Sequence, residues 1–135
     1  MKTTLLIGSV ATLLSIPASA SQGGSFAQRA CMIEGSFALL GQTIRSKDCM
    51  QASPAEKDEA VFRQSCSELA NVSAAMGGKP GKVTYLARCE TPAQGTCKNL
   101  MGSGRDAYYY ARSADDLAAL PASCELLRGK WLPGR

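Results

Sequence analysis

The sequence contains no histidine among its 135 residues. Histidine is the commonest general base, the usual partner of a nucleophilic serine or cysteine, and a frequent ligand of catalytic zinc and copper. Its absence argues against most hydrolytic and metal-dependent active sites. We therefore expect no metal and no other cofactor, and the sequence indicates no catalytic residue.

Aromatic residues and charge of one sign are also scarce. Only 6% of the residues are aromatic, and 15 basic against 11 acidic side chains give a formal net charge of +4. The basic residues are spread along the chain, whereas nucleic-acid-binding proteins gather them into a dense stripe. We therefore expect no nucleic acid as a partner.

A long apolar run occurs only near the beginning of the chain. Lys2 precedes the apolar stretch from Leu5 to Ile16, and Ala18-Ser19-Ala20 has the small-x-small pattern of a cleavage site. This arrangement predicts a signal peptide at residues 1–20, followed by an exported chain in the periplasm or the external medium. Because a spanning helix needs ~20 apolar residues, no membrane span is expected.

All six cysteines lie in the predicted mature chain, at Cys31, Cys49, Cys66, Cys89, Cys97 and Cys124. An even number of cysteines in a small exported chain predicts three disulfides. The alternatives are a metal site and a redox-active dithiol, but both favour cysteines two residues apart, and no such pair exists.

Equal cysteine spacing suggests an internal repeat. Cys31 and Cys66 are separated by 35 positions, as are Cys89 and Cys124, and a serine precedes the second cysteine of each pair. If the two halves share one plan, the preferred pairing among the fifteen possible is Cys31 with Cys66, Cys89 with Cys124, and Cys49 with Cys97.

Local patterns predict helices in three places. Apolar residues recur at helical spacing from Phe26 to Leu40, and helix start signals occur at Ser53-Pro54-Ala55-Glu56 and at Ser113. Pro121 is expected to split the last helix, because proline cannot donate the backbone hydrogen bond. Residues 42–52 are polar and are expected to form a loop.

Two β-rich segments, 82–89 and 106–112, complete the expected fold. Two strands alone are marginally stable and require a packed helix. The sequence thus predicts an α+β fold in which about three helices pack on a two-stranded antiparallel hairpin. Residues 21–135 are expected to form a single small domain stabilised by disulfides.

The most unusual short stretch is Tyr108-Tyr109-Tyr110, flanked by Arg105 and Arg112. In a strand, Tyr108 and Tyr110 share one face and Tyr109 takes the other. Tyrosine and arginine suit recognition of a protein or a sugar, and Trp131 is a further candidate anchor. The alternative is that these aromatic residues only cover a small core.

These observations favour a non-enzymatic binding or interaction protein, whose partner is another protein or an envelope polysaccharide. A small envelope-acting hydrolase or a toxin or inhibitor component is the main alternative, and a cleft with a strongly shifted carboxylate pKa would favour it. A subunit of a surface structure is a third possibility. The sequence leaves the oligomeric state open.

Overall fold

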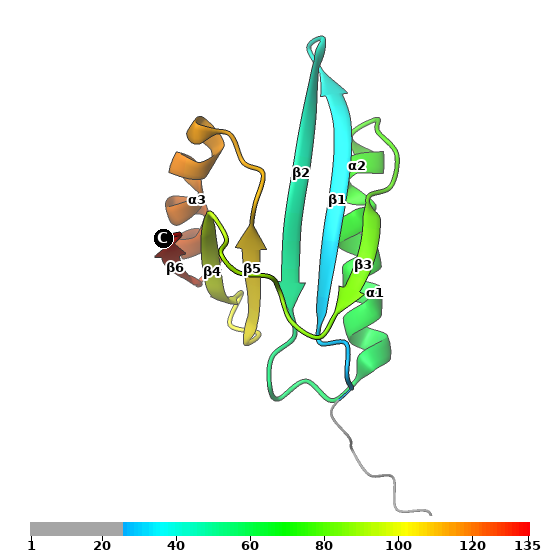
Figure 1. Ribbon diagram of the computed structural model, residues 1–135, viewed down its shortest axis with the longest axis vertical. Coiled ribbons are helices and arrows are strands. Elements are labelled where there is room, and N and C mark those ends of the chain that lie inside the picture. Colours follow the sequence, from blue (N-terminus) through cyan, green and yellow to red (C-terminus); the bar gives the residue numbers. More distant parts are fainter. Residues whose placement is uncertain (1–25) are drawn as a thin grey trace, which may run out of the picture.

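The computed structural model describes residues 26–135, so the expected signal peptide lies outside the described residues. Six strands form one antiparallel sheet in the order β3-β1-β2-β5-β4-β6 (Figure 1). The elements are β1 (Ala30–Leu39), β2 (Gln42–Gln51), α1 (Glu59–Ala70), α2 (Val72–Ala75), β3 (Lys82–Leu86), β4 (Gly95–Leu100), β5 (Arg105–Tyr109), α3 (Ala114–Leu126) and β6 (Lys130–Pro133).

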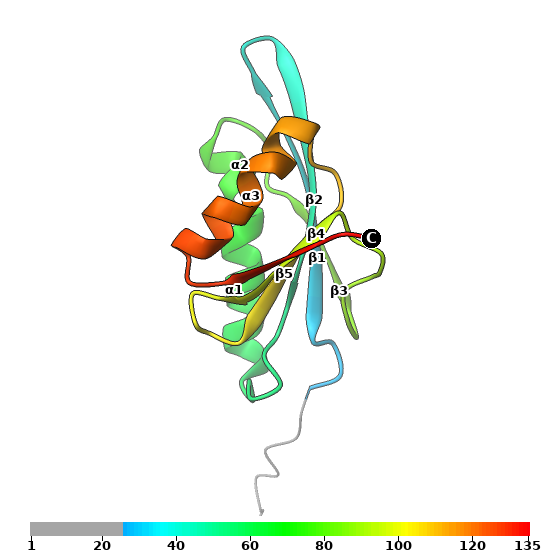
Figure 2. The same cartoon turned by 90° about the vertical axis from the view of Figure 1, so that its left-hand side faces the viewer.

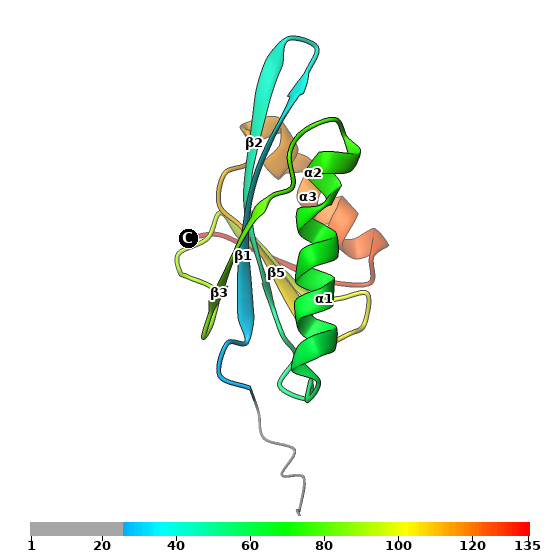
Figure 3. The ribbon, with the colours of Figure 1, turned by 90° about the vertical axis from the view of Figure 1, so that its right-hand side faces the viewer.

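The helices lie on one face of this sheet, which we call the helix face (Figures 2 and 3). Helix α1 contacts β1 and β3, and helix α3 contacts β4 and β6. The opposite face, called the open face, carries no helix of residues 26–135 and is crossed by the connection between β3 and β4, residues 87–94. The sheet therefore separates two chemically different surfaces.

The expected fold of three helices on a two-stranded hairpin is wrong. The segment predicted as the first helix is strand β1, and the predicted loop 42–52 contains strand β2. These strands form a hairpin through Leu40 and Gly41, whose φ angles are 51° and 79°. Both central residues of such a two-residue turn need positive φ, and their twist matches that of the flanking strands. Local apolar spacing did not reveal this pairing.

Two predicted strands exist, but they do not pair with each other. Strand β3 lies beside β1, whereas β5 lies between β2 and β4. Strands β4 and β6 were not predicted, because β4 includes Gly95 and Asn99 and the four-residue β6 ends at Pro133. Glycine, asparagine and proline are all depleted in strands.

The helix ends were predicted with mixed success. Ser113 is the N-cap of α3, where its hydroxyl accepts a hydrogen bond from the Asp116 amide at 3.2 Å. Helix α1 starts later than expected, with Asp58 as its N-cap, because Ser53 forms a separate turn. Pro121 lies inside α3 without splitting it. The helix thus tolerates the loss of the one backbone hydrogen bond that proline cannot donate.

The two halves of the chain follow the same plan. In each half a hairpin is followed by a helix and by a strand that returns to the outer side of the first hairpin strand. Cys31 lies opposite Met50 in the first hairpin, and Cys97 lies opposite Ala107 in the second. Met50 and Ala107 lie directly opposite each other where the halves meet. An approximate twofold axis therefore passes between these two residues.

The disulfides agree with this symmetry. Cys31 pairs with Cys66, as expected, and Cys97 pairs with Cys124, so that each half links its first strand to its helix. The third disulfide joins Cys49 to Cys89. The expected pairs Cys89 with Cys124 and Cys49 with Cys97 are wrong, because the sheet lies between their members. Cys49 and Cys89 belong to the open face, whereas Cys97 and Cys124 belong to the helix face.

Each face has its own small core. On the helix face, Phe62 and the Cys31–Cys66 disulfide are buried with Phe26 and Met50. On the open face, Met32 and the Cys49–Cys89 disulfide are buried, and Tyr108 and Tyr110 pack against them. The residues at the base of the central strands are thus covered from both sides, and this arrangement fixes the position of the tyrosine-bearing strand.

Candidate functional site

The sheet separates the residues that the sequence marks as a recognition site. Tyr109 lies on the helix face near Arg112 and Trp131, while Tyr108 and Tyr110 lie on the open face. This division follows the alternation expected of a strand. The three tyrosines therefore do not form one continuous surface.

On the helix face, Tyr109 and Arg112 line a groove of about 260 Å³ between α1, α2 and the central strands. Apolar side chains of both halves form its walls, and the Arg112 guanidinium pairs with Asp48 at its floor. The guanidinium also lies 5.2 Å from the centre of the Tyr109 ring. Burial raises the pKa of Asp48, and the neighbouring Arg112 opposes that shift only in part.

This groove does not hold the pair of carboxyl groups that a two-carboxylate hydrolase uses. Among the described residues that line it, Asp48 is the one carboxyl group. Glycoside hydrolysis and comparable acid–base chemistry require a second carboxylate whose pKa differs from the first. Asp48 is instead committed to Arg112, and burial also raises the pKa of the adjacent Tyr109.

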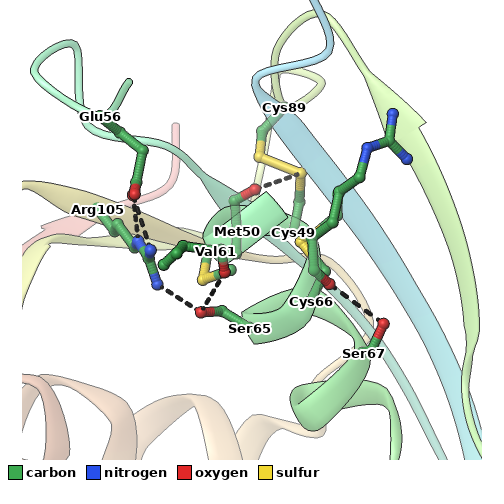
Figure 4. The surroundings of a disulfide bond; sticks show 11 residues. Cys49, Met50, Glu56, Val61, Ser65, Cys66, Ser67, Cys89 and Arg105 are labelled. Carbon is green, nitrogen blue, oxygen red and sulfur yellow. Dashed lines mark hydrogen bonds and ion pairs between the residues drawn. A yellow bond between two sulfur atoms is a disulfide. The ribbon is translucent and has the colours of Figure 1, made fainter. Parts of the chain in front are cut away.

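Arg105 and Trp131 hold elements of the fold together. Arg105 contacts Glu56 at 2.7 Å and donates a hydrogen bond to the Ser65 hydroxyl at 2.9 Å (Figure 4). It thereby ties β5 to α1 and to the turn before that helix. The Trp131 ring lies 5.9 Å from the Tyr109 ring and covers Gly95, where a side chain would overlap it.

On the open face, Tyr110 holds the connection between β3 and β4. Its hydroxyl donates a hydrogen bond to the Glu90 carbonyl at 2.7 Å, and burial raises its pKa to about 12. The Cys49–Cys89 disulfide fixes the same connection. Tyr108 lines a separate cleft of about 490 Å³ between this connection and the C-terminal residues.

A group of cations lies further along the open face, near the β1–β2 hairpin. We call Arg45, Lys47, Lys79 and Lys82 the cationic patch. Arg45, Lys79 and Lys82 line a hollow of about 400 Å³ together with Glu34, Ser36 and Thr43. Lys47 lies on the same face of β2, with its ammonium 5.7 Å from the centre of the Tyr110 ring.

The cationic patch is not neutralised by local ion pairs. Within residues 26–135, the ion pairs use other cations, namely Arg63, Lys98, Arg105 and Arg112. Glu34 is the one acidic residue lining the described hollow. Four cations beside one carboxylate leave a local excess of positive charge that attracts anions.

Acidic residues gather instead on the helices. Helices α1 and α3 carry five carboxylates, Glu59, Glu68, Asp115, Asp116 and Glu125, against one cation, Arg63. The modest net charge of the chain thus conceals a separation of charge between its two faces. Sequence reasoning missed the patch, although Arg45 and Lys47 alternate as residues on one face of a strand do.

Apolar side chains at the tip of the same hairpin were also missed. Leu39 is 50% exposed and Leu40 is 96% exposed. The hairpin projects beyond the other strands, so these leucines stand at one end of the molecule (Figure 1). The sequence signal is the uncharged stretch of residues 35–44, which the local patterns divide between the end of a predicted helix at Leu40 and a predicted loop from residue 42.

The remaining chemical features of residues 26–135 are simple. This part of the chain contains no cluster of three or more His, Cys, Asp or Glu side chains suited to a metal ion. None of its helices is long and apolar enough to cross a membrane. Comparisons with protein-family models, with curated proteins and with solved structures give no match to this chain.

Proposed function

We propose that this protein is a non-catalytic, exported binding protein whose open face recognises an anionic component of the cell envelope. The observation that carries the proposal is the cationic patch. A partner bearing phosphate or carboxylate groups would complement its excess charge and release the counterions that otherwise surround it.

The shape of the patch supports binding of an extended, charged surface. Its hollow is open and lined by polar and charged residues, with Arg45, Lys79 and Lys82 around one side of the sheet. Arginine forms paired hydrogen bonds with phosphate or carboxylate, while lysine acts as a more mobile point charge. These groups suit repeated anionic contacts better than enclosure of one small molecule.

Three disulfides are compatible with an extracellular or periplasmic location. All six cysteines of the chain take part in them, and such bonds persist mainly in oxidising compartments. A location at the cell envelope would place the patch near polysaccharides and lipids that carry phosphate or carboxylate. The location and the partner are both part of the proposal.

Binding of inorganic polyphosphate and of polygalacturonate would test the proposed site. The double variant Arg45→Gln/Lys82→Gln should bind about thirtyfold more weakly than the unchanged protein, because each surface cation contributes ~1 kcal/mol. The affinity of the unchanged protein should also fall with salt. Titration at several salt concentrations measures both effects.

The control is Lys57→Gln/Arg128→Gln, which removes the same charge from two exposed residues outside the patch. This variant should retain most of the affinity. Equal losses in the two double variants would show that net charge, rather than the patch, determines binding. Failure of the unchanged protein to bind either polymer would also refute the proposed recognition of repeated anionic groups.

A further inference from the structure

The turn of the first hairpin violates two preferences of folded proteins. Leu40 has a φ of 51° and is almost fully exposed. Positive φ is unfavourable for a leucine, and the first residue of this turn type is usually asparagine, aspartate or glycine. An exposed leucine also gains nothing from burial. Asparagine would adopt the positive φ more easily and would be better solvated at this exposed position. The stability of the fold therefore does not explain why residue 40 is leucine.

The related turn in the second half provides a comparison. Met101 and Gly102 have φ angles of 54° and 69°, and Leu100 precedes them as Leu39 precedes Leu40. The Met101 amide donates a hydrogen bond to the Leu127 carbonyl at 2.8 Å, and Met101 lines a hollow with the end of α3. The second turn therefore rests against its helix.

The first turn stands away from its helix. Strands β1 and β2 are each 10 residues long, compared with 6 for β4 and 5 for β5. The extra length carries the tip beyond the rest of the sheet (Figure 3). The β1–β2 hairpin thus holds its apolar turn away from the rest of the protein, whereas the turn of the β4–β5 hairpin lies against α3.

Charge divides the projecting hairpin into two zones. Residues 35–44 contain no charged side chain, and they include Phe37, Leu39 and Leu40. Arg45 begins the cationic patch, about 16 Å from the tip at the rise of an extended strand. An uncharged apolar end followed by cations matches the order of hydrocarbon and phosphate in an anionic lipid layer.

We propose that this hairpin docks the protein on an anionic lipid surface, with Leu39 and Leu40 inserted and the cationic patch facing the lipid phosphates. The inference rests on the proposed function, because it uses the same patch. A protein pocket would accept the leucines, but the four cations on the open face behind the tip favour an extended surface that carries many negative charges. Pairing of Leu39 with Gln42 satisfies the backbone close to the tip.

Sedimentation with phospholipid vesicles tests this docking. Vesicles of phosphatidylcholine mixed with phosphatidylglycerol should bind the protein, and vesicles of phosphatidylcholine alone should bind it at least tenfold more weakly. Leu40→Asn should weaken binding to the anionic vesicles about tenfold, since it removes one leucine side chain that the lipid would bury. Its unfolding midpoint in urea should stay the same or rise, because asparagine suits the turn.

Met101→Asn is the matched control, because it makes the corresponding change in the turn of the second half. It should leave vesicle binding unchanged. Leu39→Trp adds a direct readout: its fluorescence should shift to shorter wavelength with anionic vesicles and stay unchanged with phosphatidylcholine. Equal vesicle binding by Leu40→Asn and the unchanged protein would overturn the proposal.

The variants separate this inference from the proposed function. Leu40→Asn should retain binding to polyphosphate, whereas Arg45→Gln/Lys82→Gln should lose both polyphosphate and vesicles. Patch-dependent binding of polyphosphate without vesicle binding would overturn membrane docking and leave the anion site intact. Vesicle binding that depends on Leu40 but is unaffected by the patch variant would instead overturn the role of the cations.

Discussion

At the scale of single residues, the side chains that look most like recognition groups also hold the fold together. Arg105 joins β5 to α1, Tyr110 holds the connection after β3, and Trp131 packs on Tyr109. Arginine, tyrosine and tryptophan are frequent in binding surfaces and in well-packed polar contacts for the same reason, since each combines large area with a donor. Residue type alone therefore does not distinguish the two roles.

Asp48 provides a residue-level prediction of pH dependence. Its pKa in the folded protein is raised above 3.8, chiefly by burial, so the protonated carboxyl is favoured in the native state. The resulting contribution to stability is complete at pH values below the ordinary pKa and is lost as pH rises through the raised value. Asp48→Asn lacks this ionisation, so its stability relative to the unchanged protein should increase as pH rises.

Urea unfolding from about pH 3 to about pH 7 measures this difference. Arg112→Gln is the informative control, because Arg112 opposes the rise in the pKa of Asp48. In that variant the loss of stability should extend to higher pH. A stability difference between Asp48→Asn and the unchanged protein that does not vary with pH would contradict the expected ionisation.

At the scale of secondary structure, the sequence revealed segments whose signals are local. The Ser113 cap and the β-rich segments of β3 and β5 are of this kind. The sequence did not reveal which strands pair, because β5 bonds to β2 across more than fifty positions. Helical spacing in residues 26–40 was misleading, since β1 is covered on both faces at Ala30–Met32 and shows no simple alternation there.

The connection over the open face gives a prediction at this scale. Tyr110→Phe removes the hydrogen bond to the Glu90 carbonyl and should lower the free energy of unfolding by about 1 kcal/mol. The freed connection should also open more often, which would expose the Cys49–Cys89 disulfide to dithiothreitol. Urea unfolding and mass spectrometry of the reduced cysteines measure these two effects.

Tyr108→Phe serves as the comparison, because that tyrosine packs on the same face without holding the Glu90 carbonyl. It should change the reduction rate of the disulfide by much less. Similar effects of the two substitutions would indicate that loss of a tyrosine hydroxyl weakens the open-face core in general.

At the scale of the whole molecule, the cysteine pattern predicted that two halves share a plan but placed the second half wrongly. The corresponding disulfides span 35 and 27 positions, because the second half has a shorter path from strand to helix. Equal spacing led to Cys89, whereas the equivalent of Cys31 is Cys97. The cationic patch was missed for a related reason, because Lys79 and Lys82 lie near Arg45 only in the folded sheet. The projecting tip was missed because the apolar spacing of residues 26–40 predicted a helix in place of strand β1.

The two halves should respond separately when one disulfide is removed. Cys97→Ala/Cys124→Ala opens a loop of 27 positions in the second half, and the entropy of the unfolded chain predicts a loss of about 3.5 kcal/mol in stability. This disulfide links β4 to α3, and the shortest strand, β6, depends on both. Amide hydrogen exchange should therefore accelerate most in α3 and β6.

Strands β1 and β2 keep the Cys31–Cys66 disulfide and their long hairpin, so their protection should fall much less. A uniform rise in exchange across residues 26–135 would show that the halves unfold as one cooperative unit despite their shared plan.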